Sequence, residues 1–290
     1  MPNMQGKVCL ITGGTNGIGR IAAQELARMG TTVVIVGRSA EKTAQVVAQI
    51  RAATGNQNVD ALLADLSSQQ EIRRLAGEFK SRYTRLDILL NNAGAMFMQR
   101  QVSVDGIEMT FAVNHLAYFL LTNLLLDTIK ASAPARIINV SSNAHTRAKI
   151  EFDNLQGERS YSPAAYGNSK LANILFTIEL ARRLQGTGVT VNALHPGFVN
   201  TGFGKNNSGF LFKILAAVVP LIARSPEKGA ETSVYLASSP AVQNVTGKYF
   251  VDSKVAQAAP QAADTAVARK LWDVSAAMVR LTDTIPTDIS

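Results

Sequence analysis

Short apolar runs recur along this chain and alternate with longer helical patterns. The runs at 8–11, 32–37, 59–64, 87–90, 136–140 and 189–194 have the length and composition of buried strands. The stretches at 20–29, 40–53, 69–83, 107–130 and 165–184 have the pattern of helices. Strands that alternate with helices predict a parallel sheet covered by helices on both faces.

A glycine-rich turn follows the first apolar run directly, over residues 12–19. Strand, glycine-rich turn and helix together form a phosphate cradle, because backbone N–H groups and the helix N-terminus face the anion. The spacing Gly13-x-x-x-Gly17-x-Gly19 differs from the commoner G-x-G-x-x-G, and a plain tight turn is the alternative. We therefore predict an α/β fold, a single Rossmann-type doubly wound domain. We expect a mostly parallel seven-stranded sheet, six of whose strands are the apolar runs named above.

The residue after the second apolar run bears on the choice of nucleotide. An acidic residue there would bind the ribose hydroxyls of NAD, whereas an arginine accommodates a 2′-phosphate. This chain has Arg38 at that place, with no carboxylate before Glu41. A guanidinium can grip a phosphate in a fork, so the sequence predicts NADP(H) over NAD(H). An ordinary surface arginine is the alternative.

Tyr166 and Lys170 lie four positions apart in a predicted helix, so both side chains leave the same face. A nearby positive charge favours phenolate over phenol and therefore lowers the pKa of a tyrosine. Such a phenol can pass a proton to a carbonyl oxygen near neutral pH. Taken alone the pair is weak evidence, since the same spacing occurs on many solvated helices.

The other candidate residues follow the predicted strands. Ligands of parallel sheets bind beyond the carboxyl ends of the strands. The residues that fall there are Gly13, Arg38, Asp65, Asn91, Ser142 and Pro196. The sequence thus predicts one site at one edge of the sheet.

Together these features resemble the short-chain dehydrogenase/reductase family over nearly the whole chain. The matching motifs are 12–19, Asp65-Leu66, Asn91-Asn92-Ala93-Gly94, Asn114, Ser141-Ser142, 166–170, and Pro196-Gly197 through Thr201. Within the family the chain is most like the retinol-dehydrogenase-like branch, because of the stretches 141–145 and 166–173.

The resemblance implies a catalytic set of four residues. Tyr166 would give the proton in reduction and take it in oxidation, and Lys170 would lower the pKa of Tyr166 and bind the nicotinamide ribose. Ser142 would hold the substrate carbonyl, and Asn114 would fix a water that links Lys170 to solvent. The cofactor-binding residues would be Gly13, Thr15, Asn16, Gly17, Ile18, Gly19, Arg38, Asp65, Leu66, Asn91, Ala93, Gly94, Tyr166, Lys170, Pro196, Gly197, Val199 and Thr201.

One spacing departs from the commonest form of the family. Ser142 and Tyr166 are 166 − 142 = 24 positions apart, about twice the usual separation. The retinol-like branch has a similar insertion, so Ser142 is retained, with Ser141 as the alternative. We expect the inserted residues 146–163 to form a loop or short helix at the mouth of the site. Because the insertion could alter faces that relatives use to pair, a homo-oligomer stays possible.

The residues after Thr201 are the candidate substrate-binding region. The resemblance implies that the segment 202–225 forms a lid over the substrate. Its part 210–223 is almost wholly apolar but too short to span a bilayer. An apolar lid predicts a bulky apolar carbonyl or alcohol substrate. Packing on the protein's own body or on a second subunit is an equal alternative, and contact with a membrane is possible but not expected. Met96, Phe97, Ser142 and Phe203 are the candidate substrate-binding residues, with packing in the core as the alternative for the apolar ones.

Composition bears on the number of domains, on binding to nucleic acids and metals, and on location. A chain of 290 residues with 47% hydrophobic content is expected to form one domain, 1–290, with a loose tail at 282–290. The net charge of +8 is spread without a basic run, so we expect no nucleic-acid binding. The three histidines lack metal-ligand spacing, so we expect no metal and interpret them as structural or supporting residues. The single cysteine excludes an internal disulfide, and no signal region begins the sequence, so cytoplasmic location is expected.

The sequence therefore predicts an NADP(H)-dependent oxidoreductase that interconverts a carbonyl and its alcohol. The alternative from another class is a non-catalytic NADP(H)-binding sensor or scaffold, which would not need the full catalytic set. A sugar-nucleotide epimerase would need a larger C-terminal region than the 290 − 196 = 94 residues after Pro196.

Overall fold

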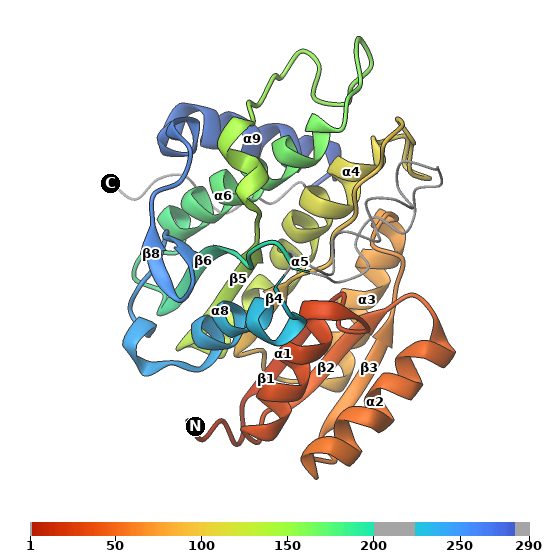
Figure 1. Ribbon diagram of the computed structural model, residues 1–290, viewed down its shortest axis with the longest axis vertical. Coiled ribbons are helices and arrows are strands. Elements are labelled where there is room, and N and C mark those ends of the chain that lie inside the picture. Colours follow the sequence, from red (N-terminus) through yellow and green to blue (C-terminus); the bar gives the residue numbers. More distant parts are fainter. Residues whose placement is uncertain (1, 200–223, 282–290) are drawn as a thin grey trace.

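An eight-stranded sheet with helices on both faces forms the centre of the protein (Figure 1). The computed structural model describes residues 2–199 and 224–281. The strands are β1 (Val8–Thr12), β2 (Thr32–Gly37), β3 (Val59–Leu63), β4 (Ile88–Asn91), β5 (Ala135–Val140), β6 (Val189–His195), β7 (Tyr249–Val251) and β8 (Lys254–Ala256), in the order β3-β2-β1-β4-β5-β6-β7-β8. β8 alone pairs antiparallel with its neighbour, β7. The predicted doubly wound α/β fold is confirmed, with one strand more than the seven expected.

The helices lie in two layers. α1 (Gly17–Arg28), α2 (Ala40–Thr54) and α8 (Pro226–Ser238) share one hydrophobic core with one face of the sheet. The other core holds α3 (Gln69–Arg82), α5 (Ala117–Ala131), α6 (Ala164–Arg183) and α9 (Thr265–Met278). Alternate residues of β1 serve the two layers, because Leu10 packs with the second core whereas Cys9 and Ile11 pack with the first. This double burial explains why the strand shows no polar alternation.

The predicted helix at 107–130 is divided into three parts. α4 (Met109–Phe111) leads into a π-helical segment, η1 (Ala112–Leu116), and α5 follows. A π-helical turn widens the helix locally, and such turns are frequent at functional sites. The last described helix, α9, begins after Asp264, whose side chain caps it by accepting the N–H groups of Ala266 and Val267.

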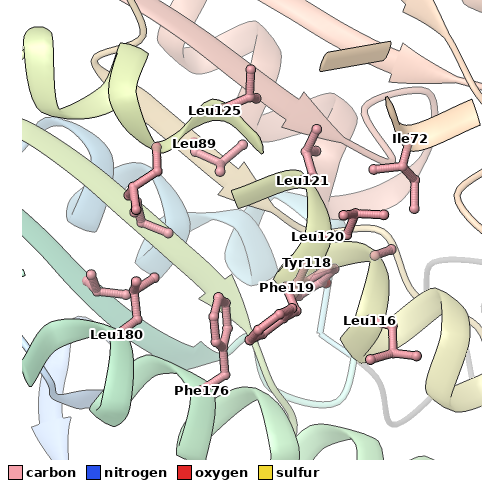
Figure 2. Close-up of a cluster of buried hydrophobic side chains, with 14 of the residues drawn as sticks. Ile72, Leu89, Leu116, Tyr118, Phe119, Leu120, Leu121, Leu125, Phe176 and Leu180 are labelled. Atoms are coloured by element: carbon pink, nitrogen blue, oxygen red, sulfur yellow. The ribbon is translucent and has the colours of Figure 1, made fainter. Parts of the chain in front are cut away.

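Aromatic side chains fill the core between α5, α6 and α9. Figure 2 shows Phe119 and Phe176 facing each other, with ring centres 5.4 Å apart. Trp272 of α9 meets Phe119 edge-on at 4.8 Å, and the Arg183 guanidinium lies 4.1 Å from the Trp272 ring. The stretch Met109–Ala131 is long and apolar enough to cross a membrane, yet 78% of its apolar window is buried inside the protein. Its composition is that of a central core helix.

The sheet order places the site. β1 has β2 on one side and β4 on the other, so the chain winds outward in opposite directions from this pair. A crevice opens at such a switch point beyond the carboxyl ends of the strands, where doubly wound folds bind ligands. The predicted tail at 282–290, Thr201, Phe203 and nearly all of the predicted lid lie outside the described residues.

Candidate active site

The glycine-rich turn after β1 is shaped by close contact with Asn92. Gly13 has a φ of +66° and Gly17 a φ of +48°, both in the left-handed region. A Cβ on Gly19 would lie 2.4 Å from the Asn92 Nδ2 atom and equally close to the Gly13 carbonyl oxygen. The Asn92 amide donates to the Thr12 carbonyl (2.9 Å) and to that of Gly13 (3.3 Å). Glycine is therefore required here so that two loops can approach each other.

Thr12 joins the same two loops from the strand side. Its hydroxyl accepts the N–H groups of Asn92 (2.9 Å) and Ala93 (3.0 Å). Thr12 and Asn92 were not among the predicted site residues, although both belong to matching motifs. Adjacency in those motifs was the only available signal, because the contact itself spans about eighty positions in sequence.

The residues predicted to face the cofactor phosphates lie at the start of α1. Asn16 is the N-cap residue, its side chain makes no capping bond, and the first turn holds no acidic residue. The positive end of the helix dipole is therefore not neutralised by a carboxylate from this helix. Thr15 and Ile18 are partly buried beside it. The turn has the shape and charge that a diphosphate requires.

Three predicted cofactor residues follow β2 and β3. Arg38 follows β2 directly, is exposed, and makes no ion pair with any residue of the described chain. Asp65 is exposed after β3, where its carboxylate accepts from the backbone and hydroxyl of Ser67 at 2.9 and 2.8 Å. Leu66 packs in the core, so a ligand could meet only its backbone.

Asn91 lies deeper than its predicted role suggests. Its side chain is fully buried and its amide donates to Thr122 (3.0 Å) and Asn139 (2.9 Å). Its side-chain oxygen is buried without a hydrogen-bond partner among the described residues, so the side chain supports the end of β4 from inside the core. Ala93 and Gly94 do reach the site, and a Cβ on Gly94 would lie 3.3 Å from the Lys170 Nζ atom.

The residues after β6 meet the glycine turn through α8. Gly229 of α8 allows close packing, since a Cβ there would lie 2.7 Å from the side chain of Val199 and 3.1 Å from that of Ile18. Gly197, with a φ of +87°, lies against the Arg224 side chain. Pro196 precedes it, partly buried. The residues that follow the first and sixth strands therefore lie close together, against the same glycine of α8.

The structure distinguishes the two adjacent serines. The Ser141 side chain is buried and its hydroxyl donates to the Lys170 carbonyl oxygen at 2.7 Å. Ser142 is partly exposed, and its hydroxyl hydrogen-bonds with Tyr166 while accepting the Ala144 N–H at 3.2 Å. Ser142 is thus the serine beside the Tyr166 phenol, whereas the Ser141 hydroxyl is bonded to the backbone of α6.

Lys170 lies beneath Tyr166 on the same face of α6. Its ammonium donates to the Val140 carbonyl at 3.1 Å and lies 5.6 Å from the Tyr166 ring centre. It also lies 5.8 Å from the ring centre of Tyr118, whose hydroxyl donates to the Ala93 carbonyl at 2.7 Å. The lysine therefore lies near two aromatic rings, each of which attracts a cation.

Burial dominates the titration of this pair. It lowers the pKa of Lys170 from its ordinary 10.5 to about 7. It also raises the pKa of Tyr166 to about 12, against a smaller lowering by the hydrogen bond with Ser142. The predicted lowering of the tyrosine pKa by the lysine is thus not the main effect in this structure, because Lys170 is buried and Tyr166 is partly buried, and burial disfavours the charged form of each. Tyr166 keeps its proton at neutral pH.

Asn114 occupies the π-helical segment and is fully buried. Its side-chain oxygen accepts the Ala95 N–H at 2.8 Å, and its amide donates to the Ala95 carbonyl (2.9 Å) and to the Ser169 hydroxyl (2.9 Å). Its own carbonyl accepts from the Asn173 amide at 2.9 Å. Asn114 therefore joins the turn beside Lys170 to α6.

The inserted residues 146–163 are tied to the segment that carries Met96 and Phe97. The Tyr161 hydroxyl donates to the Phe97 carbonyl at 2.8 Å, and Arg100 donates to the Gln156 carbonyl at 2.9 Å. Met96 and Phe97 are both partly buried. The insertion and this segment therefore form one wall, in agreement with the expected loop near the mouth of the site.

Comparison with known proteins agrees with this geometry. The family model described as short chain dehydrogenase matches residues 7–209. The chain belongs to this family. Retinol dehydrogenase 13 of Homo sapiens is 48% identical over 282 residues, which cover 95% of this chain and 85% of that protein. The predicted similarity of this short-chain dehydrogenase to the retinol-dehydrogenase branch is confirmed.

Solved structures of the family share the fold. An uncharacterized protein from Mycobacterium Paratuberculosis has a TM-score of 0.78 at 30% identity, covering 99% of this chain and 97% of that one. The Pseudomonas aeruginosa RhlG/NADP active-site complex has a TM-score of 0.69 at 32% identity, covering 86% of this chain and 96% of that one. This short-chain dehydrogenase is accordingly an oxidoreductase of a family that binds a nicotinamide cofactor.

Proposed function

We propose that this protein is an NADP(H)-dependent oxidoreductase that interconverts a bulky apolar carbonyl compound and its alcohol, with Tyr166 as the general acid and base. The observation that carries the proposal is the Ser142–Tyr166 hydrogen bond with Lys170 buried beneath the phenol. A non-catalytic binding protein would have no need of this arrangement.

The residues present fit a nicotinamide dinucleotide. A glycine turn too crowded for any Cβ at Gly13 or Gly19 lies against the N-terminus of α1, where a diphosphate is attracted. When bound, the cofactor supplies the hydride that adds to the carbonyl carbon. Lys170, Ala93 and Gly94 would bind its ribose side, and Val199 its carboxamide and diphosphate side.

Residues of the protein itself would supply the proton that the substrate carbonyl oxygen takes up. Ser142 would donate a hydrogen bond to the substrate carbonyl oxygen and so fix it beside the Tyr166 hydroxyl. Tyr166, which is protonated at neutral pH because burial raises its pKa to about 12, would then give its proton to that oxygen. The protonated form of Lys170 would stabilise the phenolate that remains, since an ammonium near the ring favours the charged form.

The preference for NADP(H) is supported by Arg38. Its guanidinium is exposed at the end of β2 and is not engaged by a carboxylate of the described chain. It is therefore available to a 2′-phosphate. The RhlG structure of Pseudomonas aeruginosa, a neighbour at 32% identity, is a complex with NADP.

The substrate class is inferred from the apolar residues around the mouth. Phe198, next to Gly197, and Met98, next to Phe97, are both exposed apolar side chains. Relatives named retinol dehydrogenase support an extended apolar alcohol or aldehyde as substrate. Cytoplasmic location and the absence of nucleic-acid binding stay predictions from the sequence. A homo-oligomer stays possible, and contact with a membrane stays possible but not expected.

The experiment compares the wild type with Tyr166→Phe. We expect the wild type to oxidise NADPH with bulky apolar aldehydes or ketones and to prefer them to small polar carbonyls. In Tyr166→Phe we expect kcat to fall by about 10³-fold while the Kd of NADPH, from a fluorescence titration, stays unchanged, because only the proton donor is lost. Retained turnover in the variant would remove Tyr166 from its role. NADPH binding by an inactive wild type would favour the sensor.

A further inference from the structure

His145 is buried directly behind Ser142, with 1% of its surface exposed. Its Nδ1 atom lies 2.7 Å from the Ser142 carbonyl oxygen, which also accepts the His145 backbone N–H at 3.2 Å. On the far side of the ring the Nε2 atom accepts the Ala259 N–H at 3.1 Å. The edge of the ring packs against Tyr249 of β7, with ring centres 4.9 Å apart.

These contacts fix one tautomer of the ring. A carbonyl oxygen can only accept, so Nδ1 carries the proton, and a backbone N–H can only donate, so Nε2 carries none. A second proton would set two N–H groups against each other at Ala259. Burial lowers the pKa of His145 in the same direction. The imidazole is therefore a neutral bridge with both nitrogens in use.

The bridge joins the turn that carries Ser142 to a distant part of the chain. Ser142 begins the short 3-10 helix η2 (Asn143–Arg147), whose residues Asn143 and Ala144 are exposed. His195 of β6 accepts the Asn143 N–H through Nδ1 at 3.1 Å. Ser142 thus lies just after the end of β5. The η2 turn that follows it is held by hydrogen bonds to the imidazoles of His145 and His195.

We propose that His145 is a positioning residue for Ser142: its Nδ1–H group holds the Ser142 backbone, and its Nε2 atom ties that backbone to the loop at Ala259. This inference rests on the proposed function, because it concerns the serine that would hold the substrate carbonyl. Displacing a catalytic group by about 1 Å can cost on the order of 100-fold in rate, so the bridge would control turnover without touching the substrate.

Two substitutions separate the two halves of the bridge. In His145→Asn the amide nitrogen can stand where Nδ1 stood and keep the bond to the Ser142 carbonyl. In His145→Gln the longer amide reaches the Nε2 position and keeps the bond from Ala259, but loses the bond to Ser142. Both variants remove the ring from Tyr249 and both should lower Tm.

We expect His145→Asn to retain kcat within roughly threefold of wild type, and His145→Gln to lose kcat by about 10- to 100-fold, with the KM for NADPH unchanged in both. Equal losses in the two variants, or losses that follow Tm alone, would show a merely structural role and overturn the proposal. A loss confined to the NADPH KM would overturn it as well.

A second measurement does not depend on turnover. Nitrogen-15 NMR of the wild type should show that His145 has a protonated Nδ1 and an unprotonated Nε2 near neutral pH. The His145→Gln variant should lack these two signals. A protonated Nε2 would contradict the bridge itself. If the wild type shows this tautomer but reduces no carbonyl, the proposed function fails, and His145 has no catalytic serine to position.

Discussion

Gly167 lies against the backbone of Ala144, so that a Cβ at position 167 would be 2.8 Å from the Ala144 carbonyl oxygen. Gly167 directly follows Tyr166 on α6, and Ala144 lies two residues after Ser142. The separation of Ser142 from Tyr166 is therefore set where these two elements touch. Real Cβ atoms do not approach an oxygen this closely, and the atom that would have to move belongs to the backbone.

Gly167→Ala is expected to push the η2 turn away from α6 and lower kcat by at least tenfold, with a loss of about 1–3 kcal/mol in the free energy of unfolding. Steady-state kinetics and urea unfolding measure the two effects. The matched control is Gly77→Ala in α3, where a Cβ would meet nothing within 4 Å. It should gain up to about 1 kcal/mol, because alanine favours a helix. Full activity in Gly167→Ala would show that the turn can shift without harm.

The exposed guanidinium of Arg38 predicts the cofactor preference. Arg38→Asp places a carboxylate where a 2′-phosphate would bind and where it could instead accept the ribose hydroxyls of NADH. We expect the ratio of kcat/KM for NADPH to that for NADH to fall by at least 100-fold. Tm should stay unchanged, since Arg38 has no ion pair in the described chain to lose. Arg269→Asp on the exposed side of α9 is the control, and an equal ratio in both variants would refute the role of Arg38.

Lys170 predicts how the stability of the cofactor-free protein changes with pH. Its pKa is about 7 when folded and near 10.5 when unfolded. Between these values the unfolded chain binds the extra proton, so the folded state becomes more stable as pH rises. Below about pH 7 Lys170 is protonated in both the folded and the unfolded state, so its contribution to stability no longer changes with pH.

Lys170→Met removes this dependence and isolates it from all other groups. The unfolding free energy of wild type relative to Lys170→Met should rise by about 2 kcal/mol between pH 7 and pH 9. Denaturant unfolding of both proteins at the two pH values gives the difference. A constant difference would mean that Lys170 keeps its charge in the folded protein, and that the two aromatic rings beside it offset its burial.

Local patterns were sufficient for the strands and for the residues at their ends. The apolar runs of β1, β2 and β4 lie buried on both sides, and the glycine turn and Arg38 fall where a parallel sheet requires. By contrast, β7 and β8 contain three residues each, too few for a recognisable period. They exist because β7 pairs with β6 and a tight hairpin returns the chain to β8. α8 begins with a serine cap and a proline in its first turn, which are local signals for a helix start.

The sequence by itself determined the fold class, the family resemblance and the candidate for the proton donor, because strand–helix alternation and motif spacing are local properties. The tertiary structure alone decided that Ser142 rather than Ser141 meets Tyr166, that the Asn91 side chain is buried, and that the His145 ring joins the Ser142 carbonyl to Ala259. Each of these depends on which way one side chain points among neighbours about thirty to more than a hundred positions away. Packing in three dimensions also reversed the expected direction of the Tyr166 pKa, because removal from water outweighs a neighbouring charge that is itself half lost near pH 7.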